Sequence, residues 1–332
     1  TGRGCLMLSR VAESMYWMAR YVERAENVAR IMDANYHMIL DLPSGVGEQW
    51  EPLVVTSGDE DLCKEFFDAF NEQYVVRFLT FDTRNPNSIL SCLQLARENA
   101  RSVREWFSSE MWQQVNTFYL LVKEASRKSG GIELPHEFFV EVMHASHHFT
   151  GLSQNTMTHG DGWQFARLGR MLERADKTAR IIDVKYFILL PSVDYVGTPY
   201  DHILWGSILR SASAFEMYRK EYGQIVPDEI IEFLVLDAEF PRAIHHCLII
   251  AELSLRNISG TMRGRFTNRA EKTLGRLLAD LDYTTIDDIK AVGLHEFIDD
   301  LQTRLNNVSN VVFETFFSIS AATSAVQDQT QS

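Results

Sequence analysis

The sequence predicts an all-α protein, a helical bundle built from two tandem, pseudo-two-fold related repeats around two long helices. Three observations predict it. Apolar residues recur at spacings of three and four over long stretches, which is typical of helices that pack on one face. The 332 residues include only eight prolines, and no long alternation of Val, Ile and Thr occurs. One charged segment is also repeated within the chain.

The repeated segment occupies residues 20–36 and 170–186, and it matches at nine of seventeen positions with an offset of 150. Most of the identities are charged residues or tyrosine rather than apolar residues, which usually exchange freely in a core. We interpret the match as a duplication that kept its charges. The identical pairs are Arg20/Arg170, Glu23/Glu173, Arg24/Arg174, Ala25/Ala175, Ala29/Ala179, Arg30/Arg180, Ile31/Ile181, Asp33/Asp183 and Tyr36/Tyr186.

A second match, at an offset of 155, extends the duplication. It pairs Trp50/Trp205, Phe78/Phe233, Leu79/Leu234, Asp82/Asp237, Pro86/Pro241, Ile89/Ile244, Cys92/Cys247, Leu93/Leu248 and Arg101/Arg256. The period is too long for a solenoid of small repeats. We therefore expect a first half-bundle at 8–152 and a second at 153–318, packed as one body, with a flexible tail at 319–332.

The two long helices are the clearest elements. The first is expected from about Leu8 to Leu40, because apolar residues recur along one face and Pro43 follows its end. The second has the same apolar face from Phe165 to Leu189. Small residues lie at equivalent places on both faces and would let the helices approach closely, namely Ala25, Ala29, Ala175 and Ala179.

The other helices follow in order, between connectors rich in turn residues. A loop at 155–162 leads into the second long helix, and 128–135 and 191–200 are connectors. The remaining helices are expected at 50–57, 60–81, 86–109, 110–128, 136–151, 202–222, 227–238, 241–259, 267–281 and 285–318.

Composition excludes several classes of function. A net charge of −13 argues against nucleic-acid binding by the whole molecule. The four cysteines are widely spaced and form no CxxC pair, so we expect buried free thiols and a cytoplasmic location. No signal peptide and no apolar run of transmembrane length is evident, so no membrane association is expected. Walker A, GxGxxG and GxSxG motifs are missing as well.

The repeated charges are the main candidates for function. Arg20 and Arg24 share a helix face, opposite the apolar one, with Trp17 one turn earlier. One interpretation is an ion-pair network, in which Glu23 pairs with Asn27, with the neighbourhood of Arg30, or with an arginine of the other copy, and locks the halves together. The other is an anion-recognition cleft at the pseudo-two-fold axis, since guanidinium groups bind carboxylate or phosphate bidentately. The two interpretations can coexist.

The candidate site residues fall into two groups. Glu23 and Glu173 are candidate catalytic residues, because burial could raise their pKa. The candidate substrate-binding residues are Glu13, Trp17, Arg20, Arg24, Arg30, His159, Asp161, Trp163, Arg170, Arg174 and Arg180.

Histidines offer weaker signals. Asp161, in the HGDGW motif at 159–163, is also a candidate N-cap of the second long helix, and His159 is a candidate proton carrier or ligand. His144 and His148 are four apart, but no HExxH pattern or third ligand is evident, so no metal site is expected.

Three segments together resemble the alpha-E family, a bacterial all-helical family with duplicated ExxR-type motifs. They are MLSRVAESMYWMARYVERAE (7–26), the HGDGW loop and GRMLERAD (169–176). The resemblance extends from Met7 to about Phe317. The motif positions that it covers are Glu13, Arg20, Glu23, Arg24, Arg30, Arg170, Glu173, Arg174 and Arg180.

The resemblance implies a context. Members of this family are typically encoded beside, or fused to, a circularly permuted ATP-grasp protein, with transglutaminase-like peptidases nearby. It therefore implies a helical component of an amide-forming or peptide-modifying system that holds an anionic or peptide substrate in an Arg/Glu cleft. The ATP-grasp partner would bind ATP and Mg²⁺, and this chain would bind no cofactor of its own. The alternatives are a stand-alone amide-forming or amide-cleaving enzyme that uses Glu23 and Glu173, and a purely structural adaptor.

Overall fold

The computed structural model describes residues 9–42, 50–128, 136–184 and 198–318. These ranges contain fifteen α-helices and one 3-10 helix, and no strand occurs within them. The predicted all-α fold is confirmed. The tail at 319–332 and the seam positions Tyr186 and Leu189 lie outside the described residues.

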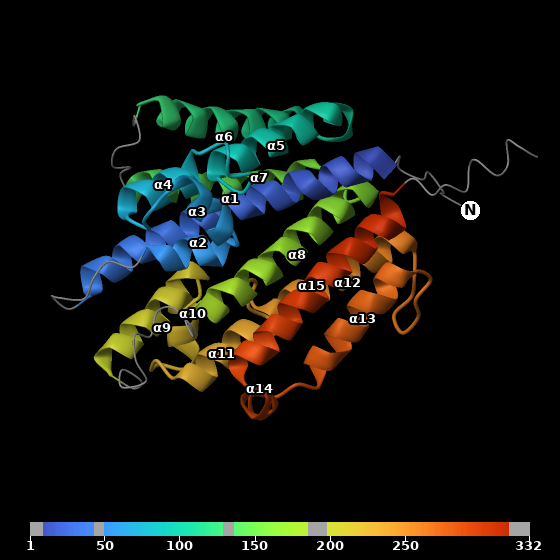
Figure 1. Ribbon diagram of the computed structural model, residues 1–332. Helices are drawn as coiled ribbons and strands as arrows, with labels where there is room; N and C mark the ends of the chain where they lie inside the picture. The colour runs from blue at the N-terminus through green and yellow to red at the C-terminus, as the bar shows by residue number, and fades with distance from the viewer. Residues whose placement is uncertain (1–8, 43–49, 129–135, 185–197, 319–332) are drawn as a thin grey trace, which may run out of the picture.

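Two long helices, α1 (Ser9–Asp41) and α8 (Asp161–Val184), lie side by side through the middle of the molecule (Figure 1). They run parallel, because successive contacts advance along both helices in the same direction. Gly169 lies against Tyr16, and farther along Arg174 pairs with Glu23. The first long helix, expected at 8–40, is confirmed to within one residue.

The two helices approach closely at a glycine. A Cβ atom built on Gly169 would lie 2.5 Å from the carbonyl oxygen of Tyr16, a distance that no side chain can occupy without a shift. Farther along, Ala25 and Ala175 are fully buried. These small residues let the two backbones come together and place the charged side chains of each helix within reach of the other.

The helices around this pair exchange partners between the predicted halves. On α1 pack α5 (Ile89–Ser102), α7 (His136–Thr156) and α9 (Pro199–Ser211); on α8 pack α2 (Glu51–Ser57), α12 (Ile244–Ser259) and α15 (Leu294–Phe316). Thus α2 of the first half contacts the long helix of the second, and α9 does the reverse. The main core cluster extends from Val11 to Phe317, and a small second cluster consists of Met38, Tyr200 and Leu204. The duplication and the boundary at 152/153 stay predictions from the sequence.

Four predicted helices are divided in the structure, so those predictions were wrong. The helix expected at 60–81 is α3 (Glu60–Phe66) and α4 (Glu72–Thr80). The chain becomes extended at Phe67, and the Asn71 side chain accepts a hydrogen bond from the Tyr74 amide and so starts α4 anew. The helix expected at 86–109 is α5, capped by Ser88, followed by η1 (Arg104–Trp106).

The other two predicted helices are divided near a residue whose backbone φ angle is positive. The helix expected at 202–222 is α9 and α10 (Phe215–Glu221), divided near Ser213 at φ 49°. The helix expected at 285–318 is α14 (Ile286–Val292) and α15, divided at Gly293 with φ 105°. Three helices complete the fold: α6 (Ser109–Lys128), α11 (Pro227–Val235) and α13 (Arg269–Asp282).

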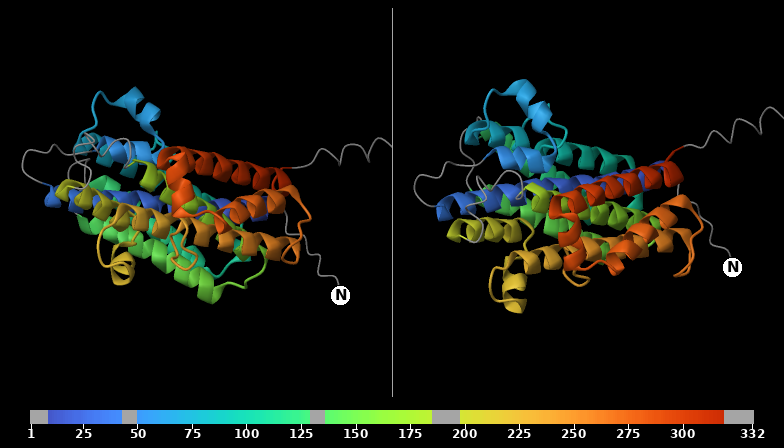
Figure 2. Two further views of the ribbon diagram at one scale, coloured as in Figure 1. Left: turned by 90° about the horizontal axis from the view of Figure 1, so that it is seen from below. Right: turned by 60° about the horizontal axis from the view of Figure 1, so that its bottom comes forward.

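The central pair is covered differently on its two sides (Figure 2). α15 and the short helices α2 to α4 lie on one side, and α7 lies on the other. The described cysteines, Cys63, Cys92 and Cys247, are free and buried as predicted, whereas Cys5 lies outside the described residues. Among the described residues, no helix combines the length and the apolar character that a membrane crossing needs.

Candidate functional site

Charged side chains meet where α1 and α8 pack together. Each helix carries one Glu-Arg dipeptide, and the dipeptides pair reciprocally. The Nε atom of Arg24 lies 2.6 Å from Oε1 of Glu173. The Nε and Nη2 atoms of Arg174 each lie 2.8 Å from an oxygen of Glu23, a bidentate pair. Both glutamate side chains are 1% exposed.

The first group of charges, here the Glu173 cluster, lies towards α15 and α2. Its members are Arg20, Arg24, Glu173, Asp176, Lys177 and Arg180. Each cation in it lies within 4 Å of a carboxylate. Arg20 Nε is 2.8 Å from Glu173, and Lys177 and Arg180 lie 3.7 and 3.0 Å from Asp176.

Neighbouring polar and aromatic groups complete the Glu173 cluster. Arg24 donates to the Asn87 side chain at 2.6 Å, and Asn87 in turn donates to Asp59 at 2.6 Å. The guanidinium of Arg20 lies over the Trp17 ring at 5.0 Å. A cavity of about 10 Å³ next to Arg24 has room for about one water molecule. This cluster is therefore closely packed, and each of its cations is paired with a carboxylate.

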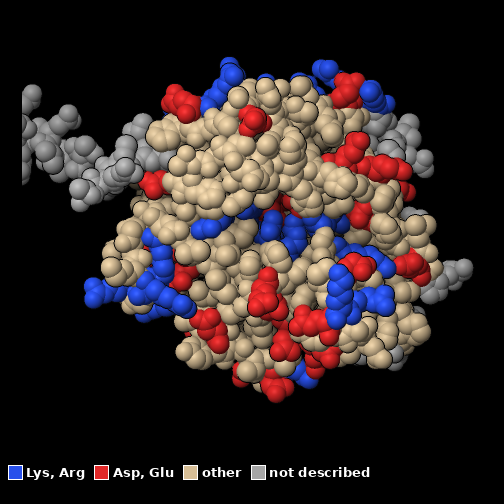
Figure 3. Space-filling model, turned by 180° about the vertical axis from the view of Figure 1, so that it is seen from behind, with Lys and Arg blue, Asp and Glu red and all other residues tan. Residues whose placement is uncertain are grey.

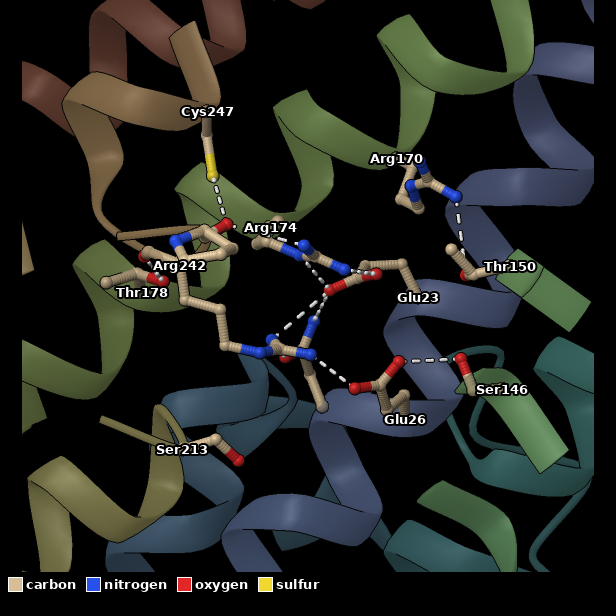
Figure 4. A network of polar contacts seen from close by, with 12 residues as sticks. Glu23, Glu26, Ser146, Thr150, Arg170, Arg174, Thr178, Ser213, Arg242 and Cys247 are labelled. Carbon is tan, nitrogen blue, oxygen red and sulfur yellow. Dashed lines mark hydrogen bonds and ion pairs between the residues drawn. The ribbon is translucent and has the colours of Figure 1, made fainter. Parts of the chain in front are cut away.

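The second group of charges, here the Glu23 cluster, lies on the side covered by α7 (Figure 4). Its members are Glu23, Glu26, Arg30, Arg170, Arg174 and Arg242. Arg242 lies 3.3 Å from Glu23 and also pairs with Glu26. Ser146 of α7 donates to Glu26 at 2.6 Å. Like the Glu173 cluster, this one holds four cations and two carboxylates.

Arg170 has no carboxylate partner in the described part of the chain (Figure 4). Its Nη1 atom donates to the Thr150 hydroxyl at 3.3 Å, and its buried Nε atom has no hydrogen-bond partner there. Its sequence equivalent, Arg20, is paired with a glutamate. On this side the corresponding carboxylate, Glu23, is already engaged by Arg174 and Arg242.

Burial destabilises the charged form of two of these arginines, Arg170 and Arg242. Desolvation, with a smaller effect of the positive Arg174, lowers the pKa of Arg170 to about 10. Desolvation and the nearby Arg30 lower the pKa of Arg242 to about 10 as well. Both groups remain charged at neutral pH, so an anion placed beside them would relieve part of this cost.

The two candidate catalytic carboxylates are held ionised. Burial by itself raises the pKa of Glu173, but Arg24 and Arg20 outweigh it, and the net pKa lies below its ordinary value. For Glu23 burial is likewise outweighed, chiefly by Arg174. A carboxylate that stays ionised and is held by bidentate arginines has no proton to give. The predicted catalytic role stays a prediction, and this geometry favours counter-ions.

Some predicted residues lie outside both clusters. Glu13 is half-buried on α1, one turn before Trp17. His159 stacks on Trp163 with ring centroids 4.0 Å apart. Asp161 is the first residue of α8 rather than its N-cap. From there to Glu173 is twelve residues, about 18 Å along the helix. The HGDGW motif is thus not brought to the Arg/Glu clusters.

Sequence reasoning missed several members of the network, namely Asn87, Arg242, Glu26 and Asp176. Asn87 and Arg242 both follow an aligned proline at the offset of 155, so they occupy equivalent places, one in each cluster. That alignment was the available signal, but the two residues differ and so were not among its identities. Glu26 was missed because its equivalent in the second copy is Asp176.

The fold and the site define an all-α bundle with an internal network of Glu-Arg pairs. The chain belongs to the Alpha-E family, which it matches over residues 7–317 and which is described as a predicted alpha-helical domain with a conserved ER motif. Glu-Arg occurs twice in this sequence, at 23–24 and 173–174, and both dipeptides take part in the reciprocal ion pairs.

Curated relatives carry no assigned activity. An uncharacterized protein of Mycobacterium bovis and uncharacterized proteins of two strains of Mycobacterium tuberculosis are each 20% identical over 339 residues. The match covers 95% of this chain but 38% of each relative. The chain thus spans well under half the length of these relatives. No solved structure matches it.

Proposed function

We propose that this chain is a non-catalytic helical component of an amide-forming or peptide-modifying system. In this proposal the Glu23 cluster receives an anionic group of the substrate, a carboxylate or a phosphate. A circularly permuted ATP-grasp protein is the proposed partner, and it supplies ATP and Mg²⁺. A transglutaminase-like peptidase is a further proposed partner. The partners come from the family resemblance, whereas the anion site comes from the geometry.

The unpaired guanidinium of Arg170 is the observation that carries the proposal. Structural ion pairs are arranged so that each buried charge has a counter-charge, because a lone buried charge costs several kcal/mol. Arg170 breaks that rule, because no carboxylate of the described residues pairs with its guanidinium and its buried Nε atom has no hydrogen-bond partner among them. An incoming carboxylate or phosphate would supply the missing charge and would accept from the planar guanidinium.

Access to the cluster supports the same conclusion. The face seen from behind in Figure 3 is crossed by a groove, and Lys and Arg side chains line its floor. This is the side covered by α7, where the Glu23 cluster lies. The Arg174 side chain is 14% exposed, and His147, which lies 3.3 Å from Glu26, is 59% exposed. An anion could therefore reach the cluster from solvent.

The role of a subunit, rather than of a stand-alone enzyme, is supported by the low pKa of Glu23 and Glu173 and their tight pairing. The length of the relatives fits a partner as well, since 38% coverage leaves room for further domains in their chains. A purely structural adaptor is the second candidate, and the Glu173 cluster, in which each cation is paired with a carboxylate, favours it.

The test combines association and activity. The tagged chain is purified with its cognate ATP-grasp protein, and amide formation by the pair is measured with wild type, with Arg170→Ala and with the control Arg101→Ala. Arg101 is 70% exposed and far from the network in sequence. We expect association in all three cases and a loss of activity of at least about 10-fold for Arg170→Ala only.

Two outcomes would overturn parts of the proposal. Failure of the two proteins to associate, together with unchanged ligase activity when this chain is added, would remove the ATP-grasp partnership. Association with full activity of Arg170→Ala would leave the adaptor interpretation and remove the anion site.

A further inference from the structure

A separate group of metal-ligating side chains lies between α1 and the start of α7. Asp33 and His37 are one turn apart on α1, and His136 is the first residue of α7. One ring nitrogen of each histidine and a carboxylate oxygen of Asp33 all lie within 4.8 Å of one another. None of the three belongs to the Glu23 or Glu173 cluster.

The short contact between Asp33 and His136 indicates that a proton or a metal ion lies between the two side chains. Oδ1 of Asp33 and Nε2 of His136 lie 2.5 Å apart. Both atoms are buried, and neither makes a well-aligned hydrogen bond with any described residue. Two atoms with lone pairs repel at this distance unless a proton or a metal ion lies between them. The imidazole of His37 is close as well, since its Nδ1 atom lies 3.8 Å from the carboxylate, so the ring of a third ligand is at hand.

The orientation of His37 suits a ligand. Its Nδ1 atom lies 2.9 Å from the carbonyl oxygen of Asp33, one helical turn earlier. A hydrogen bond from Nδ1 to that oxygen leaves the lone pair on Nε2. Metal-ligating histidines commonly fix their second ring nitrogen in this way. The rings of His37 and His136 meet edge to face, with centroids 4.8 Å apart.

We propose that Asp33, His37 and His136 form a site for a divalent transition-metal ion, with Zn²⁺ as its natural occupant. Two imidazoles and one carboxylate suit Zn²⁺, Co²⁺ or Ni²⁺, whereas Mg²⁺ and Ca²⁺ prefer oxygen ligands alone. Ligands about 2.0–2.1 Å from a tetrahedral Zn²⁺ lie about 3.3 Å from one another. Small side-chain rotations bring the present group to that spacing.

Three protein ligands leave one coordination position open. Water or a carboxylate from a bound molecule can fill it, as in zinc sites that interact with substrate. The metal would also fasten the first turn of α7 to α1. This matters for the Glu23 cluster, because α7 carries Ser146 and Thr150, which contact Glu26 and Arg170. The metal site does not depend on the proposed anion site.

The experiment measures Zn²⁺ binding by the full chain after treatment with EDTA. Calorimetry with Zn²⁺, and with Mg²⁺ for comparison, is applied to wild type, His37→Ala and His136→Ala. The double variant His144→Ala/His148→Ala is the matched control, because both residues are exposed histidines of α7, four apart. Co²⁺ absorption then reports the coordination geometry.

We expect one Zn²⁺ per chain in wild type and in the control, and no saturable Mg²⁺ binding. Each ligand variant should bind Zn²⁺ at least about 10-fold more weakly, since removal of even an outer partner of a metal ligand has that effect. Circular dichroism confirms folding of the variants, whose mutated side chains are 45% and 41% exposed. Unchanged Zn²⁺ affinity in both ligand variants, no stoichiometric binding in wild type, or a loss only in the control would overturn the proposal.

Discussion

The Glu173 cluster and the Glu23 cluster use the same residue types at equivalent sequence positions, yet they differ in how their charges are balanced. Arg20 is paired with a glutamate, whereas its equivalent, Arg170, reaches only a threonine hydroxyl. The residue after the aligned proline accounts for the difference. It is Asn87 beside Glu173 and Arg242 beside Glu23. Arg242 is the added cation, and it pairs with Glu23. Arg170 is then left without a carboxylate partner among the described residues.

The difference implies a division of labour within one network. The Glu173 cluster holds α1 and α8 together, and the Glu23 cluster does so while one of its arginines, Arg170, has no carboxylate partner among the described residues. Buried pairs are costly to break but add little net stability when intact. Substitutions in the two clusters should therefore have unequal effects.

Removal of Glu173 should have the largest effect. Glu173→Gln keeps the shape of the side chain but leaves Arg20 and Arg24 buried without a counter-charge. We expect the free energy of unfolding to fall by about 3–5 kcal/mol. Urea denaturation measures it, with the exposed Arg101→Ala as control, expected to change by less than about 0.5 kcal/mol. A loss below about 1 kcal/mol would show that the cluster does not hold the helices.

The comparison of Arg20→Ala with Arg170→Ala tests the asymmetry directly. Arg20→Ala removes one partner of a buried pair and should cost about 3 kcal/mol. Arg170→Ala relieves repulsion from Arg174 and should leave stability nearly unchanged or slightly higher. Thermal melts of both variants decide it. Equal large losses would mean that Arg170 has a structural role like that of Arg20.

Gly169→Ala tests whether close helix approach supports both clusters together. The added methyl group meets the Tyr16 carbonyl, and overpacking of this kind costs about 1–3 kcal/mol. The control is Gly151→Ala in α7, where a Cβ atom meets nothing within 4 Å. There the better helix propensity of alanine should add up to about 1 kcal/mol. Equal effects of the two substitutions on the urea midpoint would contradict the close approach.

The smallest expected effect is on how the free energy of unfolding depends on pH in wild type and in Glu173→Gln. The difference should still be measurable. The folded-state pKa of Glu173 is lowered, so its stabilisation is fully present above the unfolded pKa of about 4.3 and is lost as pH falls below it. Each such carboxylate contributes up to about 1.4 kcal/mol per pH unit. Urea midpoints between pH 7 and pH 3 should fall less steeply for Glu173→Gln. An identical slope in wild type and variant would argue against the lowered pKa.

The sequence predicted the long helices well, because their spacing of apolar residues is sustained over many turns. It also singled out the arginines and glutamates that meet, including pairing between the copies as one interpretation. It did not predict the breaks at Ser213 and Gly293, because local backbone conformation interrupts a periodic pattern that continues on both sides. Arg242 and the group around Asp33 were missed because they join segments far apart in the chain.

Residues that contact each other in the folded protein are far apart in the chain, and this affects the order in which contacts can form during synthesis. Arg24 and Glu173 are 149 residues apart, and the hydroxyl of Ser9 donates to the carbonyl oxygen of Phe316, 307 residues later. A ribosome that adds 5–20 residues per second takes about 7–30 s to cover 149 residues. During that interval the charges of α1 remain hydrated beside an apolar face that has no α8 to bury it. α1 thus reaches its native surroundings only after α8 has been made, and the contact of Ser9 with the end of α15 forms later still.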